Sequence, residues 1–79
     1  YRAKSGTEVD LVLEEPHAFR AIEIKFAEKL SPKDLRSLKR LRELEWPKPL
    51  KLHVIYRGME YLDIDGVQAL PVHALWRAR

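Results

Sequence analysis

The sequence contains no cysteine and only three histidines, and these shortages exclude several kinds of site. Without thiols the chain forms no disulfide and has no thiolate metal site. The histidines are too scattered for the ligand spacing of a zinc site: His17, His53 and His73. The three glycines form no phosphate-binding loop, so any ATP chemistry would lie outside this segment.

Long apolar runs are also missing, so no window predicts a membrane span, and no secretory signal is visible. The chain is 46% hydrophobic and 34% charged, which is typical of a soluble globular domain. Its 79 residues favour a single domain, residues 1–79, and we expect a cytoplasmic setting. Because the first residue is Tyr1 rather than methionine, we expect a C-terminal piece of a longer protein.

Two segments alternate charged and apolar residues as strands do. Glu8 to Leu13 forms the first predicted strand, and Phe19 to Phe26 the antiparallel return strand of a hairpin. Side chains two residues apart share a face of a strand. On the first strand this separates two acids from three apolar residues: Glu8 and Asp10 from Val9, Leu11 and Leu13.

The return strand repeats the pattern, with Glu23 and Lys25 on one face. Its opposite, apolar face carries Ile22, Ile24 and Phe26. If the two strands pair, three carboxylates and one ammonium group converge at one end of a small sheet.

A helix is predicted to follow, because Ser31, Pro32 and Asp34 have the order of a helix cap, a first-turn proline and a capping acid. Its apolar stripe consists of Leu35, Leu38, Leu41 or Arg42, and Leu44. The prolines of segment 46–49 end the helix.

Leu50 to Tyr56 is the next predicted strand, with Leu50, Leu52, Val54 and Tyr56 on one face. A right-handed crossover through the helix would make it parallel to the Glu23 strand. The predicted fold class is therefore α/β: a small mixed sheet with an antiparallel hairpin, a crossover helix and a parallel strand.

The remaining predictions concern shorter segments. Tyr1 to Lys4 is a candidate edge strand, and Tyr61 to Ile64 a weak fifth strand. Asp63 to Gly66 resembles the start of a calcium loop but lacks the later acid, so we interpret it as a turn. Val67 to Trp76 is expected to be an extended piece with one helical turn at His73 to Trp76.

Converging carboxylates are suited to a magnesium ion. Hydrolysis of a phosphodiester develops negative charge that carboxylates repel and a divalent cation stabilises. Asp10 and Glu23 are the candidate ligands, with the Ile24 carbonyl as an additional oxygen. Lys25 is the candidate catalytic ammonium group. Glu8 is a fourth candidate, as an acceptor behind the ligands or as a replacement for one.

Basic residues gather around the predicted helix. Segment 28–51 holds eight Lys or Arg against four acids, an excess of +4, while the whole chain carries +3. Four of them are candidate DNA phosphate contacts: Arg36, Lys39, Arg40 and Arg42. A solvated helix face would have the same composition.

The Glu8-Val9-Asp10 and Glu23-Ile24-Lys25 motifs resemble the core motif of the PD-(D/E)XK nuclease superfamily, with its restriction-endonuclease-like or Holliday-junction-resolvase-like fold. This resemblance covers Gly6 to Tyr56. Nearly the whole chain is similar to the C-terminal domain of unknown function of many prokaryotic AAA-type ATPases, through segments 1–10, 21–25, 31–35, 54–58 and 69–75.

The resemblance implies metal ligation by Asp10 and Glu23, catalysis by Lys25, and attachment to an ATPase portion of the parent chain. The leading helix of that nuclease core, which in many members carries another acid, is absent from this sequence. An apolar sheet face would then be left for a second copy of the chain to cover, as in a homodimer.

Three readings follow from the sequence. The first is a magnesium-dependent domain that hydrolyses DNA phosphodiesters. The second is a catalytically inactive module of the same fold that binds nucleic acid or protein. The third is a structural domain, in which Asp10 would point into solvent with no acidic neighbour.

Overall fold

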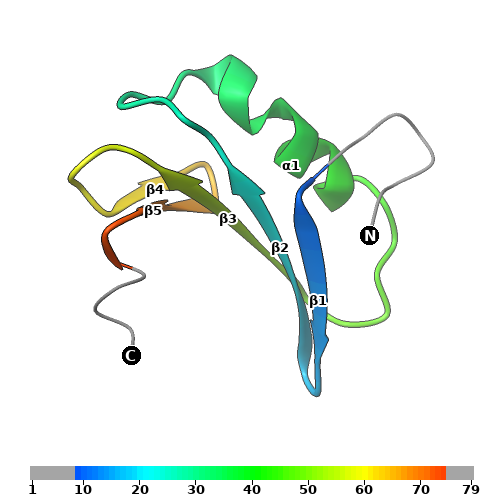
Figure 1. Ribbon diagram of the computed structural model, residues 1–79. Coiled ribbons are helices and arrows are strands. Elements are labelled where there is room, and N and C mark those ends of the chain that lie inside the picture. The colour runs from blue at the N-terminus through cyan, green and yellow to red at the C-terminus, as the bar shows by residue number, and fades with distance from the viewer. Residues whose placement is uncertain (1–8, 75–79) are drawn as a thin grey trace.

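The chain forms a mixed five-stranded sheet with one helical segment packed on one side (Figure 1). The computed structural model describes residues 9–74. The strands are β1 (Leu11–Glu15), β2 (Ala18–Ile24), β3 (Leu50–Tyr56), β4 (Leu62–Ile64) and β5 (Val67–Pro71). The helical segment between β2 and β3 is a 3₁₀ turn, η1 (Pro32–Leu35), that continues into α1 (Arg36–Arg42).

The strand order is β1-β2-β3-β5-β4, which confirms the predicted α/β class. β1 is antiparallel to β2, and β4 is antiparallel to β5. The three central strands β2, β3 and β5 are parallel to one another. The predicted hairpin, crossover helix and parallel strand are therefore all present.

The first strand of the hairpin lies further along the chain than predicted, and the return strand ends at Ile24 rather than Phe26. Glu14 and Glu15 lie beyond the predicted end of the first strand at Leu13, but they belong to β1 and leave a two-residue turn. Arg20 donates from Nε and Nη2 to the Glu15 carboxylate, both at 3.1 Å. Lys48 Nζ donates to Glu14 Oε2 at 2.8 Å. These two ion pairs give both glutamates partners within the folded sheet, so the strand extends to the turn.

The prediction that Leu11 and Leu13 lie on the buried face of β1 is wrong. Leu11 and Leu13 are 42% and 40% exposed, whereas Val9 is buried and Val12 packs against the core. The two valines are three residues apart and nevertheless reach the same side, because the chain bends at Asp10 before β1 begins. A strict period of two cannot describe a segment that contains this bend.

The helical segment begins with the predicted capping residues. Ser31 N–H donates to Asp34 Oδ2 at 2.9 Å, and Asp34 N–H donates to the Ser31 carbonyl at 2.9 Å. Leu35, Leu38 and Leu41 are fully buried and form the center of the core.

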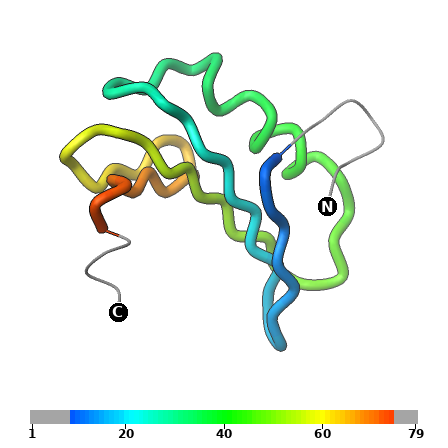
Figure 2. The backbone as a smooth tube through the Cα atoms, viewed as in Figure 1, coloured from blue at the N-terminus to red at the C-terminus, as the bar shows by residue number. Residues whose placement is uncertain are grey.

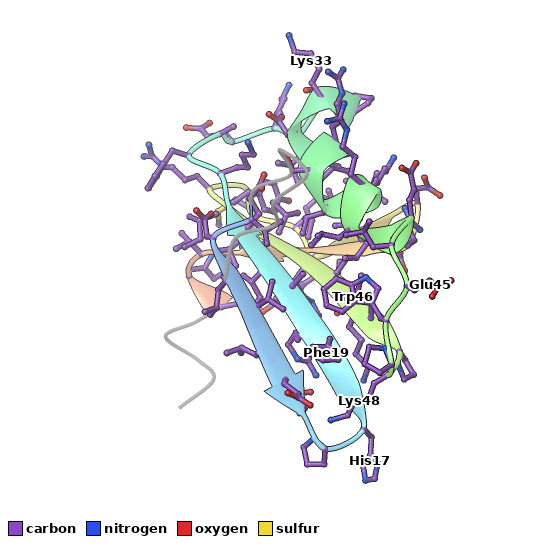
Figure 3. The ribbon with its side chains drawn as sticks, turned by 90° about the vertical axis from the view of Figure 1, so that its right-hand side faces the viewer. His17, Phe19, Lys33, Glu45, Trp46 and Lys48 are labelled. Carbon is purple, nitrogen blue, oxygen red and sulfur yellow. The ribbon has the colours of Figure 1, made fainter. Side chains whose placement is uncertain are left out.

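The helix ends earlier than the predicted stripe requires. α1 stops at Arg42, so Leu44 lies beyond it and is 44% exposed. Trp46 instead contacts the helix end, where its Nε1 donates to the Leu41 carbonyl at 2.8 Å. The ring centroids of Trp46 and Phe19 lie 5.1 Å apart. Figure 3 labels both side chains.

β3 completes the helix-covered face of the sheet. Leu52, Val54 and Tyr56 are buried on this face, as the sequence predicted, together with four residues of the neighbouring strands: Ala21, Glu23, Val67 and Ala69. The opposite face of the sheet, which we call the open face, carries no helix within residues 9–74.

The segment after β3 differs most from prediction. Val67–Pro71, predicted only as part of an extended piece, is a strand paired in parallel with β3. Asp65 and Gly66 make the reversal that returns the chain from β4, with φ angles of 52° and 84°. The predicted edge strand at residues 1–4 and the second half of the predicted helical turn at 73–76 lie outside the described residues.

The helical segment is too short to cross a bilayer. Within residues 9–74 no helix has both the length and the apolar character that a membrane span needs.

The core predicts a sharp contrast between two leucines of the predicted stripe. Leu38→Ala should lower the free energy of unfolding by about 2–5 kcal/mol, because it empties a fully buried site. Leu44→Ala should change it by less than about 0.5 kcal/mol, because that side chain lies beyond the helix. Urea unfolding followed by circular dichroism measures both, and equal losses would show that the helix continues through Leu44.

Candidate functional site

The carboxyl end of β2 brings an acid from β2 close to one from the start of β1. Leu11 pairs with Ile22 across the hairpin, so Asp10 comes beside Glu23. Asp10 Oδ2 accepts a hydrogen bond from the Ile24 N–H at 2.7 Å. Asp10 is exposed as a residue, but this bond fixes its carboxylate against β2.

Glu23 is a buried carboxylate on the helix-covered face of the sheet. The residue is 7% exposed, and its Oε2 lies 3.1 Å from Lys25 Nζ. Burial raises the pKa of Glu23, because the charged form loses water. The charges of Asp10 and Asp34 raise this pKa further, whereas Lys25 opposes the shift without cancelling it.

The structure therefore brings Asp10, Glu23 and Lys25 together, and we call these three residues the β2-end cluster. The solvent-facing, isolated Asp10 that would mark a purely structural domain is not what the geometry shows. Glu8, the fourth candidate, lies outside the described residues.

Asp34 is a neighbour of the cluster that the sequence assigned only to helix capping. It does cap the helix, and its bond to the Ser31 backbone holds the pKa of Asp34 low. Its negative charge also acts on Glu23 and Lys25. The motif Ser-Pro-x-Asp predicted its place on the helix, but only the packing of η1 beside the end of β2 shows this second effect.

The β2-end cluster offers a metal ion two carboxylates, those of Asp10 and Glu23. Within residues 9–74 no group of three or more His, Cys, Asp or Glu side chains is placed to hold an ion. Magnesium needs fewer protein ligands, since it is bound through one or two carboxylates together with waters and substrate phosphates. The donor set of Asp10 and Glu23 is consistent with that mode.

The basic residues of the helix divide into two pairs. Lys39 and Arg42 reach toward the β4–β5 turn, where Lys39 Nζ lies 3.1 Å from Asp65 Oδ2 and Arg42 Nη1 donates to the Asp65 carbonyl at 2.9 Å. Arg36 and Arg40 are exposed. They line an open hollow along the outer side of the helix together with Ser31, Pro32, Lys33, Lys39 and Glu43.

Asp65 is a residue that sequence reasoning missed. The Asp-Gly pair predicted the turn, but nothing in the sequence placed that turn against the helix. The contacts with Lys39 and Arg42 hold the pKa of Asp65 below its ordinary value. Two of the four candidate phosphate contacts, Lys39 and Arg42, are therefore already paired with Asp65.

A second polar cluster lies at the opposite end of β2. Arg20, held by Glu15, donates from Nη1 to His53 Nε2 at 2.8 Å, so the proton of the neutral ring lies on Nδ1. Burial lowers the pKa of His53, and the charges of Arg20 and Lys51 lower it further. This cluster ties β1, β2 and β3 together on the opposite face of the sheet from Glu23.

The raised pKa of Glu23 predicts how stability depends on pH. The folded chain holds this proton more tightly than the unfolded chain, so stability falls as pH rises from the ordinary value of about 4.5 through the raised value. Glu23→Gln cannot ionise and should escape this loss. The variant should match the parent near pH 4 and be more stable than the parent at pH 7.

Thermal unfolding between pH 4 and pH 8 measures this difference. Glu45→Gln, at an exposed position after the helix, controls for the loss of a surface carboxylate. A Glu23→Gln variant that is less stable than the parent at pH 7 would show that the Lys25 ion pair outweighs burial.

Comparison with known proteins identifies the family but no relative of known activity. Neither the curated proteins nor the solved structures gave a match to this chain. Residues 1–75 match the family described as a domain of unknown function, DUF4143. Because this match covers nearly the whole sequence, the chain belongs to the DUF4143 family.

Proposed function

We propose that this chain is a magnesium-dependent domain that hydrolyses phosphodiester bonds of DNA. The observation that carries the proposal is the β2-end cluster, in which two carboxylates and one ammonium group meet at the end of a central strand. The buried carboxylate of Glu23, whose pKa burial raises, is costly to keep charged in a small domain, and a bound cation would offset that cost.

Each residue of the cluster has a distinct task in this proposal. Asp10 and Glu23 would hold the ion, and the ion would supply charge stabilisation at the reacting phosphate. The backbone N–H of Ile24 orients the Asp10 carboxylate through their 2.7 Å hydrogen bond. Burial beneath the helix holds Glu23 in place and limits the access of water to it.

Lys25 would act on the phosphate from the same end of β2. Its ammonium group now neutralises part of the Glu23 charge at 3.1 Å. Its side chain is 36% exposed, so it can also reach an anionic group that approaches from solvent. A cation on Glu23 would release Lys25 toward the developing negative charge.

The helix supplies positive charge beside the cluster. Arg36 and Arg40 line the open hollow on its outer side together with Lys33, and the hollow begins at the residues that cap the helix. Asp34, which acts electrostatically on Lys25, belongs to the same cap. The phosphate backbone of DNA would follow this surface toward the β2-end cluster.

Further parts of the proposal concern the setting of the domain. The resemblance to ATPase C-terminal domains supports attachment to an AAA-type ATPase and work in the cytoplasm. The exposed apolar residues of the open face support contact with a second copy of the chain.

A second candidate is a catalytically inactive module that binds nucleic acid or protein. The Glu23–Lys25 ion pair favours it, because the lysine is already partnered and only two carboxylates gather within residues 9–74. This candidate differs from the first in needing neither a metal ion nor the charge of Asp10.

Magnesium binding separates the two candidates. Isothermal titration of the purified chain should show millimolar magnesium binding that Asp10→Asn abolishes and Glu45→Gln leaves intact. Cleavage of branched or duplex DNA should need the ion and fall on the order of a hundredfold or more in Lys25→Ala.

Two results would decide against catalysis. A parent chain that binds no magnesium and cuts no DNA is not an enzyme of this kind. Salt-sensitive DNA binding that Asp10→Asn leaves unchanged would then establish the binding module.

The division of the basic residues predicts unequal effects on DNA binding. Arg36→Gln and Arg40→Gln should each weaken duplex binding and reduce the slope of log affinity against log salt by about one. Lys39→Gln should change the slope less, because Asp65 already pairs with that ammonium group. Fluorescence anisotropy across a range of salt concentrations measures the slopes, and equal effects at all three positions would show that the Asp65 contact does not matter.

A further inference from the structure

A hollow on the open face lies next to the β2-end cluster and is not used by it. It has a volume of about 340 Å³, near the lower end of the range of roughly 300–1,000 Å³ for small-molecule sites. Six of its lining residues carry the argument: Ile24, Lys25, Phe26, Ile55, Arg57 and Val72. Lys25 belongs to both the hollow and the cluster.

The hollow lies where the parallel strands β2, β3 and β5 end. Ligands of open α/β sheets bind outside the carboxyl ends of the strands. Figure 2 shows the segment after β2 and the loop after β3 running side by side at this end of the sheet, and Arg57 N–H donates to the Ala27 carbonyl at 2.9 Å. Val72 N–H donates to the Tyr56 carbonyl at 2.8 Å. These backbone bonds fix the walls of the hollow before any ligand arrives.

The lining of the hollow combines apolar side chains with two cationic ones. Ile24 and Ile55 are paired residues of β2 and β3 and form an aliphatic floor. Phe26 is 85% exposed, so its ring presents nearly all of its surface to solvent. The two charged residues of the lining, Lys25 and Arg57, are both cations.

We propose that this hollow binds one unpaired base of a DNA strand, with Phe26 as the stacking ring and Arg57 as a contact to the adjoining phosphate. The inference rests on the proposed function, because it places the strand beside the β2-end cluster. A base has an apolar, planar face and a neighbouring anionic phosphate, which matches a lining that contains one exposed aromatic ring and two cations. A base that is stacked within a duplex cannot reach such a ring, so the site selects single-stranded, branched or frayed DNA.

A second copy of the chain is a poorer occupant of this hollow. A symmetric dimer centred here would bring Lys25 and Arg57 of both copies together, and like charges would oppose the contact. Elsewhere on the open face this objection does not apply.

Binding of fluorescent oligonucleotides in the presence of EDTA tests the inference without any metal. The parent should bind a single-stranded thymidine oligomer more tightly than a duplex of equal length. Phe26→Leu should weaken single-strand binding by about tenfold and leave duplex binding unchanged, whereas Phe26→Trp should restore it. Because Phe26 is 85% exposed, these variants should fold as the parent does, and circular dichroism verifies the fold.

Tyr61→Leu is the matched control, because Tyr61 is another exposed aromatic residue, at 61%, and does not line the hollow. It should leave both affinities unchanged. Equal affinity for single strands and duplexes, no single-strand binding, or equal losses in Phe26→Leu and Tyr61→Leu would overturn the inference. A change of sedimentation from dimer to monomer in Phe26→Leu would overturn it in favour of a second copy.

These outcomes are separable from failure of the proposed function. Single-strand preference that depends on Phe26 supports the base site even if the chain binds no magnesium. Magnesium binding that depends on Asp10, without any effect of Phe26, leaves the metal site standing and removes the base site.

Discussion

The placement of Glu23 on the helix-covered face of β2 is the constraint on which the rest of the structure depends. Alternation along β2 puts Ala21 and Glu23 toward the helix and Ile22 and Ile24 toward the open face. The core thus contains a carboxylate where an aliphatic side chain would pack at lower cost. Asp10 reaches the same place because Leu11 pairs with Ile22, and Lys25 because it follows the end of the strand.

The same alternation produces the two surfaces that the proposals use. On the covered side, the helix buries its leucines against Ala21 and Val54, and its cap brings Asp34 near Glu23. On the other side, Ile24 is 47% exposed, and no helix of residues 9–74 covers the ends of β2 and β3. A nucleic acid that crosses the strand ends would meet the carboxylates on one side and the apolar hollow on the other.

Much of the fold was predictable from local chemistry, because the relevant signals span only a few residues. The limits of β3 at Leu50 and Tyr56, the capping pair of Ser31 and Asp34, and the reversal at Asp65 and Gly66 all follow from such signals. The errors arose where distant residues decide the outcome. Glu15 joins β1 because Arg20 lies across the turn, and β5 becomes a central strand because β3 offers it a parallel edge, although Pro71 weakens its own strand signal.

In the candidate site, too, local sequence signals predicted some features, and the packing of distant residues decided the others. The spacing of Asp10, Glu23 and Lys25 predicted that they would meet, and their geometry agrees with that expectation. The burial of Glu23, the influence of Asp34 and the capture of Lys39 by Asp65 could not be predicted, since each depends on how the helix packs on the sheet. The hollow beside Phe26 likewise exists only where the ends of β2 and β3 and the residue after β5 meet.

The most direct measurement is a carbon-13 NMR titration of the Glu23 carboxyl group with and without magnesium. The account predicts a raised pKa for Glu23 in the absence of the ion and a clear decrease when magnesium is added, because the ion favours the charged form. A Glu23 pKa that is the same in both conditions, while Asp10 also shows no response, would contradict the central claim that this cluster is a cation site.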